Sequence, residues 1–243
     1  MTDRCGGTRD VDLLRAELGV IWRLDERGRL PGPESLVIGV AADGMTAAVA
    51  GGVPGETAAR LLSLISGPGA PPDVLDDCRE LLGGEAVSIS GGPTYLVDPP
   101  VRAGVAAEVL RSDSADHVRL AWSLARPDDW GADEWDDLVA GDEGAPWAMI
   151  ADGGQVVALC HTSRLTPSGA EAGTWTSPAY RGRGFAAATT AAWSELLPGL
   201  LLFYSTSAGN HSSQRVAQRL GLRPLGWLWK LTSPPAGSPD QVM

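Results

Sequence analysis

The chain opens with an apolar pattern that is typical of an amphipathic helix. Val11, Leu14, Leu18 and Ile21 recur at helical spacing behind Asp10. Beyond them the pattern alternates between short strands and helices, separated by Gly and Pro. It predicts strands over 36–40 and 45–49, helices over 56–65 and 72–82, and a hairpin of strands 86–90 and 94–97 around Gly91-Gly92-Pro93.

The pattern changes after Asp98-Pro99-Pro100, which we interpret as a boundary. The segment that follows predicts a strand near 105–110, a helix over 117–125 and an acidic, tryptophan-bearing segment over 128–139. The final third is the most regular. It predicts strands over 147–150, 156–161 and 173–176, a Gly-rich turn and an Ala-rich helix, then a strand over 200–205, a helical segment over 210–222 and a strand over 227–231.

The mixture of strands and helices predicts an α/β or α+β chain. Its length and composition alone fit one large domain or two small ones, and the boundary at residues 98–100 favours two. We expect an N-terminal α/β domain over residues 1–100, a second domain over 101–232 and a flexible C-terminal tail over 233–243. With 243 residues, of which 44% are hydrophobic, the chain can bury a substantial core.

The charge of the chain opposes binding to nucleic acid. Its formal net charge is −11, which is unfavourable near a polyanion. The charge is unevenly distributed, however, because residues 155–243 carry +4 and the rest of the chain carries −15. This local basic excess fits binding of a small anion and fits scattered exposed arginines equally well.

Cysteine usage and the N-terminal segment favour a cytoplasmic protein. Cys5, Cys78 and Cys160 are too few for a disulfide framework and are not spaced as metal ligands, so we expect no metal site. Residues 1–10 contain no apolar segment of the kind found in secretory signals, and the apolar runs are too short to cross a lipid bilayer. We therefore expect no membrane partner.

The candidate chemistry lies in the Gly-rich turn at residues 178–186. Gly182 and Gly184 stand between a predicted strand and a predicted helix, where glycine lets the backbone approach a ligand closely. The N–H groups at a helix N-terminus attract phosphate, and Arg181 and Arg183 add positive charge. A simple connecting loop uses the same residues. The turn lacks the Lys-Ser/Thr pair of a Walker loop and the third glycine of a Rossmann fingerprint.

What remains resembles the GNAT superfamily of N-acetyltransferases. The pyrophosphate loop of that family has the form Arg/Gln-x-x-Gly-x-Gly/Ala, which Arg181, Gly184 and Ala186 match. Residues 171–178 look like the family's fourth strand, residues 200–205 like its fifth, and residues 210–222 like the helix that ends in Leu-Gly-hydrophobic. The resemblance is strong over 147–231 and loose over 101–144.

The resemblance implies the GNAT fold, a mixed and mostly antiparallel central sheet flanked by helices. The smaller N-terminal α/β domain is then either a degenerate GNAT-like unit or a segment that shapes the acceptor cleft. The implied activity is transfer of an acetyl group from acetyl-CoA to a primary amine of a small molecule or peptide in a ternary complex. No metal is implied, and a homodimer is one possible assembly.

The resemblance also implies roles for particular residues. Glu171 would accept the proton of the amine, directly or through water. The family often protonates the leaving thiolate with a tyrosine where this chain has Ala217. Tyr204 is our first candidate for that acid, with Ser205, Ser207, His211 and water as alternatives. Coenzyme A would be bound by Trp175, Thr176, Arg181, Gly182, Arg183, Gly184, Phe185, Ala186, Asn210 and Ser213.

Several alternatives stay open from the sequence alone. Because of Ala217, the domain could bind acyl-CoA without turnover, as a sensor or scaffold. Glu171 could be a solvated charge or a salt-bridge partner. The acidic segment 128–139 could contact a cationic amine, or it could be a helix with a solvated acidic face and inward tryptophans. A longer acyl-CoA could replace acetyl-CoA as donor.

Overall fold

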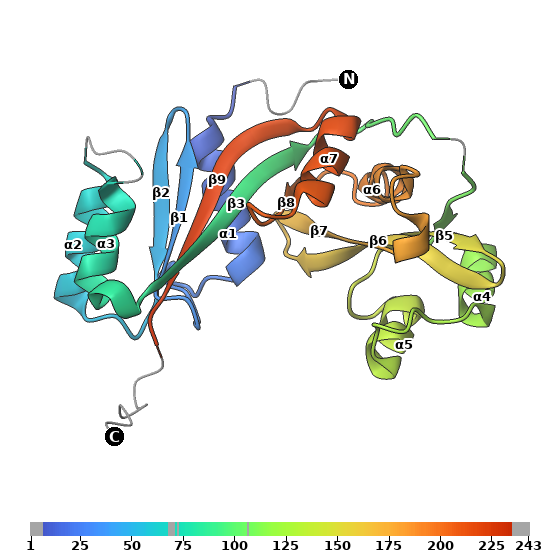
Figure 1. The fold of residues 1–243 in the computed structure, drawn as a ribbon, viewed down its shortest axis with the longest axis horizontal. Coiled ribbons are helices and arrows are strands. Elements are labelled where there is room, and N and C mark those ends of the chain that lie inside the picture. Colours follow the sequence, from blue (N-terminus) through green and yellow to red (C-terminus); the bar gives the residue numbers. More distant parts are fainter. Residues whose placement is uncertain (1–6, 68–70, 72, 106, 235–243) are drawn as a thin grey trace. The chain divides into compact units, whose positions relative to one another are not determined.

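The computed structural model describes residues 7–67, 71, 73–105 and 107–234, and in these ranges the chain forms seven α-helices and nine strands. The chain divides into two compact units, one of residues 1–93 and 225–243 and one of residues 94–224 (Figure 1). The domain boundaries expected from the sequence stay a prediction, and most of the expected tail lies outside the described residues.

The first unit contains the strand order β2-β1-β9-β3. Strand β1 (Leu36–Ala41) pairs antiparallel with β2 (Gly44–Val49) on one side and with β9 (Arg223–Thr232) on the other. Leu36 lies opposite both Val49 and Leu231, so three apolar side chains meet on one face. This register forms the centre of the first core.

Three helices cover this part of the sheet. Helix α1 (Asp10–Trp22) packs against β1 and β2, where Leu14 meets Gly39. Helices α2 (Gly55–Ile65) and α3 (Asp73–Leu82) pack on the opposite face, because Leu36 and Ile38 share their core with Leu61 and Leu75. The three helices and the strands β1 and β2 confirm the elements expected for this region.

Strand β3 (Ser88–Val97) corrects the predicted hairpin, because a single strand runs through Gly91-Gly92-Pro93. A side chain at Gly91 would meet the main chain of Leu228 and lie 2.9 Å from the ring of Trp229. The glycine therefore serves close approach to β9 and does not form a turn. Sequence alone cannot separate these two uses of Gly.

The second unit contains the strand order β3-β8-β7-β6-β5-β4. Strands β5 (Trp147–Asp152), β6 (Gln155–Leu165) and β7 (Gly169–Thr176) form an antiparallel meander. Strand β8 (Leu201–Ser205) pairs parallel with β7 and antiparallel with the end of β3. The strands are thus mostly antiparallel, as the resemblance implied.

Helices cover both faces of these strands (Figure 1). Helix α6 (Phe185–Ser194) and helix α7 (His211–Leu220) pack on the face that presents Cys160, Leu202 and Tyr204. Helix α4 (Ala115–Ser123) and helix α5 (Ala132–Ala140) belong to the other face, where Trp135 packs with Trp147 and Leu159. Alternate strand residues therefore serve two separate cores.

Helix α6 is buried although it carries threonines. The hydroxyls of Thr189 and Thr190 donate to main-chain carbonyls of the preceding turn, so both buried hydroxyls are hydrogen-bonded. The indole of Trp193 donates to Thr162 over 2.9 Å. Small alanine side chains of the same helix are also buried against the sheet.

The strand expected near 105–110 is wrong in extent, because only β4 (Leu110–Arg111) pairs there and residue 106 lies outside the described part. Val105 and Val109 instead pack on apolar clusters as part of a loop. Their apolar character reflects burial and not strand pairing. In the described ranges, no helix is long and apolar enough to cross a membrane.

Candidate active site

The Gly-rich turn connects the end of β7 to the start of α6. A short 3-10 helix (Pro178–Tyr180) begins it, and Gly182 and Gly184 follow with φ angles of +79° and +85°. Residues with side chains rarely adopt this conformation, which explains why glycine stands at both positions. Gly184 has no side chain to cap the first N–H groups of α6, so these groups stay available to a ligand.

Gly184 also lies against a cation. A Cβ atom at Gly184 would meet the guanidinium of Arg219, which belongs to α7, and would lie 2.7 Å from the side chain of Val105. A positive charge at the N-terminus of a helix is unfavourable on its own, because that end of the helix dipole is positive. An anion bound at this position would stabilise both groups.

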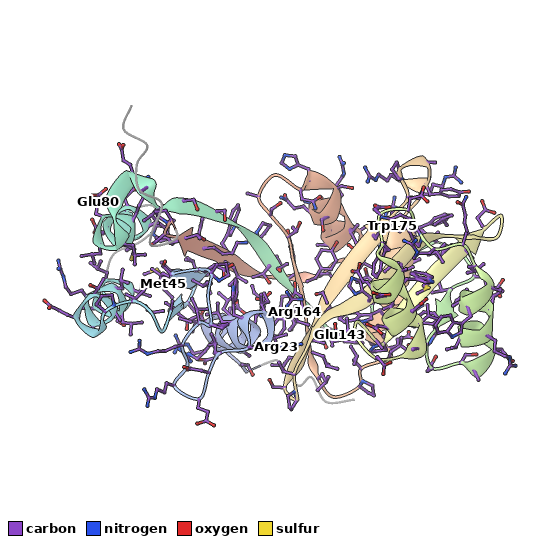
Figure 2. The ribbon with its side chains drawn as sticks, turned by 90° about the horizontal axis from the view of Figure 1, so that it is seen from below. Arg23, Met45, Glu80, Glu143, Arg164 and Trp175 are labelled. Carbon is purple, nitrogen blue, oxygen red and sulfur yellow. The ribbon has the colours of Figure 1, made fainter. Side chains whose placement is uncertain are left out.

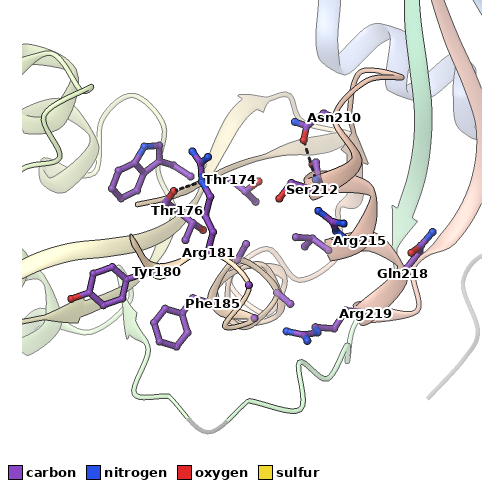
Figure 3. A pocket seen from close by; sticks show the side chains of 17 residues that line it. Thr174, Thr176, Tyr180, Arg181, Phe185, Asn210, Ser212, Arg215, Gln218 and Arg219 are labelled. Atoms are coloured by element: carbon purple, nitrogen blue, oxygen red, sulfur yellow. Dashed lines mark hydrogen bonds between the residues drawn. The ribbon is translucent and has the colours of Figure 1, made fainter. Parts of the chain in front are cut away.

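A pocket of about 910 Å³ opens at this helix end (Figure 3). Its lining comes from the end of β7, the Gly-rich turn, the first turn of α6 and one side of α7. The lining residues are Thr174, Trp175, Thr176, Tyr180, Arg181, Gly182, Gly184, Phe185, Ala186, Ala187, Asn210, Ser212, Ser213, Arg215, Val216, Gln218 and Arg219.

Three arginines line the pocket, and no carboxylate is among its lining residues. Arg181 comes from the turn, and Arg215 and Arg219 stand four residues apart on α7, which places them on the same side of that helix. This excess of positive charge suits a ligand with several phosphate oxygens. The sequence reasoning missed Arg215 and Arg219, although their spacing was a signal for a shared face.

Arg183 is placed differently from Arg181. Its guanidinium lies over the ring of Tyr180, 4.6 Å from the ring centroid, and donates to the carbonyl of Ala179. Arg183 is not among the residues that line the pocket. In this arrangement its side chain stabilises the turn by a cation–π contact instead of facing the pocket.

The N-terminus of α7 forms the opposite wall. The side-chain oxygen of Asn210 accepts a hydrogen bond of 3.0 Å from the N–H of Ser213 and thereby caps the helix (Figure 3). Asn210 and Ser213 both line the pocket, and their binding of coenzyme A stays a prediction. The cap leaves the amide nitrogen of Asn210 as a donor for a ligand.

Thr176 contributes a polar atom that has no partner. Its Oγ1 is buried, and among the described residues nothing forms a hydrogen bond with it. Its carbonyl accepts a hydrogen bond from Nε of Arg181. Buried hydroxyls are normally paired, so an unpaired one at a pocket wall is consistent with a missing ligand group.

Strands β7 and β8 part next to this pocket. Their parallel pairing in the described chain covers 169–171 with 201–203, whereas β7 continues to Thr176 and β8 to Ser205. Beyond Glu171 the edge of β7 that faces β8 is therefore open to another extended chain.

Glu171 lies where the two strands part. Its side chain is only 7% exposed, and Oε1 accepts hydrogen bonds from the N–H of Ser205 at 2.9 Å and from the hydroxyl of Ser205 at 2.6 Å. Oε2 is buried without a hydrogen-bond partner in the described chain. Burial raises the pKa of Glu171 to about 7, against the opposing effects of Ser205 and of the Arg164 charge.

Tyr204 lies behind the pocket wall. It is 1% exposed, and its hydroxyl is 2.6 Å from Oγ of Ser213 and 3.5 Å from Oγ1 of Thr174. Burial raises the pKa of this phenol, so it stays protonated at neutral pH. The hydroxyl of Ser213, which lines the pocket, therefore lies between Tyr204 and the pocket.

The acidic, tryptophan-bearing segment is tied to β7 on the other face of the sheet. The indole N–H of Trp175 (labelled in Figure 2) donates to Oδ2 of Asp129 over 2.8 Å. Trp175 also packs against the cluster that contains Trp130 and Trp135. Trp130 and Trp135 are buried, which agrees with the reading of this segment as a helix with inward tryptophans. His161 packs edge-on against Trp130.

Of the predicted coenzyme residues, all except Arg183 line one pocket. Glu171 and Tyr204 do not line it. Glu171 bonds to Ser205 at the strand divergence, and Tyr204 lies behind Ser213. The contact of Ser205 with Glu171 and the contact of Thr174 with Tyr204 were not predicted from the sequence. No group of three or more metal-ligating side chains occurs in the described ranges.

Comparison with known proteins identifies a family. The model of the "Acetyltransferase (GNAT) domain" matches residues 98–223, more than half of the chain. Curated proteins gave no match. Among solved structures, a GCN5-related N-acetyltransferase from Kribbella flavida shares 18% identity over 95% of this chain and 97% of its own, with a TM-score of 0.53.

A second structural neighbour is an acetyltransferase from the GNAT family from Colwellia psychrerythraea. It shares 13% identity, covers 93% of this chain and 96% of its own, and has a TM-score of 0.51. At these identities the structures show the fold alone. The predicted fold and the predicted family are confirmed.

Proposed function

Because the chain belongs to the GNAT acetyltransferase family, we propose that it transfers an acetyl group from acetyl-CoA to a primary amine of a small molecule or peptide. One observation carries the choice of donor. The pocket at the N-terminus of α6 combines free helix N–H groups with Arg181, Arg215 and Arg219 and lies beside the open edge of β7. This arrangement suits a diphosphate with an extended arm.

The residues of the pocket divide between the two ends of this donor. The helix N–H groups and the three arginines would bind the pyrophosphate. The arm would run along β7 beyond Glu171, where Asn210 and the unpaired hydroxyl of Thr176 offer polar partners. The thioester would then lie where β7 and β8 part, close to Glu171. Such positioning removes much of the entropic cost of the reaction.

The N–H group of Thr176 is the group that we propose polarises the thioester carbonyl. The N–H of Ser177 donates to the main-chain carbonyl of Val157 on β6. N–H groups of successive strand residues point to opposite edges, so the N–H of Thr176 points away from β6, toward the open edge. A main-chain donor at that position would stabilise the charge that develops on the carbonyl oxygen.

Glu171 is the proposed base. An amine attacks the thioester carbon only when it is neutral, and a carboxyl with a pKa of about 7 accepts a proton effectively near neutral pH. The attack forms the new C–N bond, the C–S bond then breaks, and the thiolate of coenzyme A leaves. The proton lost by the amine goes to the Glu171 carboxylate.

Tyr204 and Ser213 are the proposed source of the proton for the leaving thiolate. Ala217 is fully buried and has no acidic group, so the usual acid of the family is missing at that position. Ser213 lines the pocket, and Tyr204 supports its hydroxyl at 2.6 Å. Ser213 would donate to sulfur and recover its proton from Tyr204 or from solvent.

Ala217 also favours a second function, binding of acyl-CoA without turnover as a sensor or scaffold. The two functions separate in one assay, release of free thiol from acetyl-CoA on addition of a panel of primary amines. Transfer predicts amine-dependent thiol release that drops at least tenfold in Glu171→Gln while acetyl-CoA binding is retained. Binding without any thiol release would support the sensor. The same assay with a panel of longer acyl-CoA donors tests whether acetyl is the acyl group that is transferred.

A further inference from the structure

The carboxyl of Glu171 cannot meet a bulky acceptor directly in the arrangement described. The residue is 7% exposed, and its Oε2 is enclosed. Its only hydrogen-bond donors in the described chain come from Ser205, which bonds to Oε1 through both its N–H and its hydroxyl. Ser205 ends β8 and is partly exposed. The exposed end of this contact is therefore the serine and not the carboxyl.

We propose that the hydroxyl of Ser205 carries the proton from the acceptor amine to Glu171, so that the base of this enzyme is a Ser205–Glu171 pair. The inference rests on the proposed acetyl transfer and names a residue that the family match does not assign. It follows from the 2.6 Å contact between Oγ of Ser205 and Oε1 of Glu171, and from the difference in exposure between the two residues.

The proton transfer balances without any added group. As the amine nitrogen bonds to the carbonyl carbon, its N–H proton passes to Oγ of Ser205. The hydroxyl proton of Ser205 passes at the same time to Oε1 of Glu171. The serine ends as it began, and Glu171 ends as a neutral acid. Release of that proton to solvent resets the pair for the next turnover.

The main-chain N–H of Ser205 explains why Ser205 and Glu171 stay in contact. The parallel pairing of β7 with β8 stops at Glu171 and Phe203, so the N–H of Ser205 has no strand partner on that side. The Glu171 carboxylate accepts this N–H and takes the place of the missing ladder bond. The backbone of β8 thus fixes the carboxyl, which leaves the hydroxyl of Ser205 free to exchange its proton.

The charged and titratable groups around Glu171 come from two strands. On β6, Arg164 lies opposite Glu171 in the strand pairing, and His161 lies opposite Gly173. On β8, Tyr204 precedes Ser205. Arg164 favours the charged carboxylate, burial opposes it more strongly, and the hydroxyl of Ser205 lowers the pKa of Glu171. Removing that hydroxyl should therefore raise the pKa.

The first test needs no substrate. The carboxyl carbon of Glu171 is followed by NMR as pH is raised, in the wild-type chain, in Ser205→Ala and in Ser205→Thr. We expect the midpoint to rise by about one pH unit in Ser205→Ala, since a hydrogen bond to a charged group is lost, and to stay near the wild-type value in Ser205→Thr. An unchanged midpoint in Ser205→Ala would overturn the proposal.

The matched control is Ser163→Ala. Ser163 also bonds to Glu171, but its hydroxyl donates to the main-chain carbonyl over 3.1 Å and not to the carboxyl. Its removal costs one hydrogen bond to the same residue without touching the proposed path. We expect the Glu171 midpoint to stay at its wild-type value in this variant. A shift equal to that of Ser205→Ala would show a general effect of loosened packing and contradict the proposal.

The second test measures turnover as a function of pH. Ser205→Ala should lower the maximal rate at least tenfold and move the acid limb of the rate profile upward, whereas Ser205→Thr should restore most of the rate. In the Glu171→Gln background, Ser205→Ala should have no further effect, because both residues act in one step. Additive losses in the double variant would contradict the relay.

The outcomes distinguish this inference from the function on which it rests. Wild-type turnover that persists in Ser205→Ala removes the relay and leaves acetyl transfer intact. Wild-type binding of acetyl-CoA with no turnover of any amine removes the proposed transfer, and the relay with it. A shifted midpoint together with loss and rescue of turnover supports both.

Discussion

The guanidinium of Arg219 on α7 occupies the space that a Cβ atom of Gly184 would take at the start of α6. The contact brings a cation from one helix to the positive end of another, next to the pocket that contains Arg181 and Arg215. Such a concentration of like charge is costly in an empty protein and favourable around an anion. We therefore expect this group of positive charges to determine the affinity for coenzyme A.

Replacing Gly184 by Ala should abolish most binding of coenzyme A. The methyl group would meet Arg219 and Val105, in addition to the strain of a φ angle of +85°. Gly182→Ala is the matched control, because φ is +79° there and nothing lies within 4 Å of the added carbon. Both variants should lose about 1–2 kcal/mol of stability from backbone strain. Calorimetry should show a much larger loss of affinity for Gly184→Ala, and equal losses would contradict the role of this contact.

Removing one pocket arginine should weaken binding by a factor of about ten, in line with loss of a charge-assisted hydrogen bond. Arg219→Gln is the variant of choice. Arg126→Gln removes the same charge from an exposed position that does not line the pocket. Titrations with coenzyme A at two salt concentrations should show weaker binding and a smaller salt dependence for Arg219→Gln alone. Equal affinity in the two variants would remove Arg219 from the site.

Glu171→Gln should stabilise the protein at alkaline pH. The pKa of Glu171 rises from an ordinary value of 4.5 to about 7 on folding, so the folded chain binds more protons than the unfolded chain between these values. The stability contributed by the neutral carboxyl is fully present below about pH 4.5 and is lost as pH rises through about 7. The loss approaches about 3 kcal/mol.

The measurement is the unfolding free energy of the wild-type chain and of Glu171→Gln from pH 5 to pH 8.5. The advantage of the glutamine variant should grow across that range. Glu143→Gln, an exposed position, should show no such trend. A constant difference between Glu171→Gln and wild type would mean that Glu171 is not buried as a high-pKa acid.

Tyr204→Phe tests the source of the thiolate proton. The variant removes the hydroxyl that bonds to Ser213 and Thr174, at a cost of roughly 1 kcal/mol of stability. Steady-state kinetics should show kcat lowered several-fold with KM for acetyl-CoA nearly unchanged, because Tyr204 does not line the pocket. If kcat is unchanged, Tyr204 supplies no proton and solvent does.

Strong periodic patterns made much of the fold predictable. The apolar spacing behind Asp10 gave α1, and the motif around Gly184 located the strand-to-helix turn and the pocket. The sequence failed where one residue type has two structural uses. Gly91 looked like a turn and is a close contact between strands, and Val105 looked like a strand residue and packs in a loop.

The site was predictable as far as its motif extends along the chain. The sequence did not predict a role for Arg219, and it offered Ser205 only as a possible acid. Their contacts with Gly184 and Glu171 join separate elements of the chain. Arg183 matched the expected chemistry, yet its contact with Tyr180 turns its side chain elsewhere. Local sequence does not encode which of two neighbouring arginines faces a pocket.

The central claim is that the N-terminus of α6 and the pocket arginines bind the diphosphate of acetyl-CoA. Calorimetric titration of the wild-type chain with acetyl-CoA tests it most directly. The account predicts saturable binding of one ligand per chain that weakens as salt is raised and is nearly lost in Gly184→Ala. Absence of heat in the wild-type chain, or equal binding in Gly184→Ala and Gly182→Ala, would contradict it.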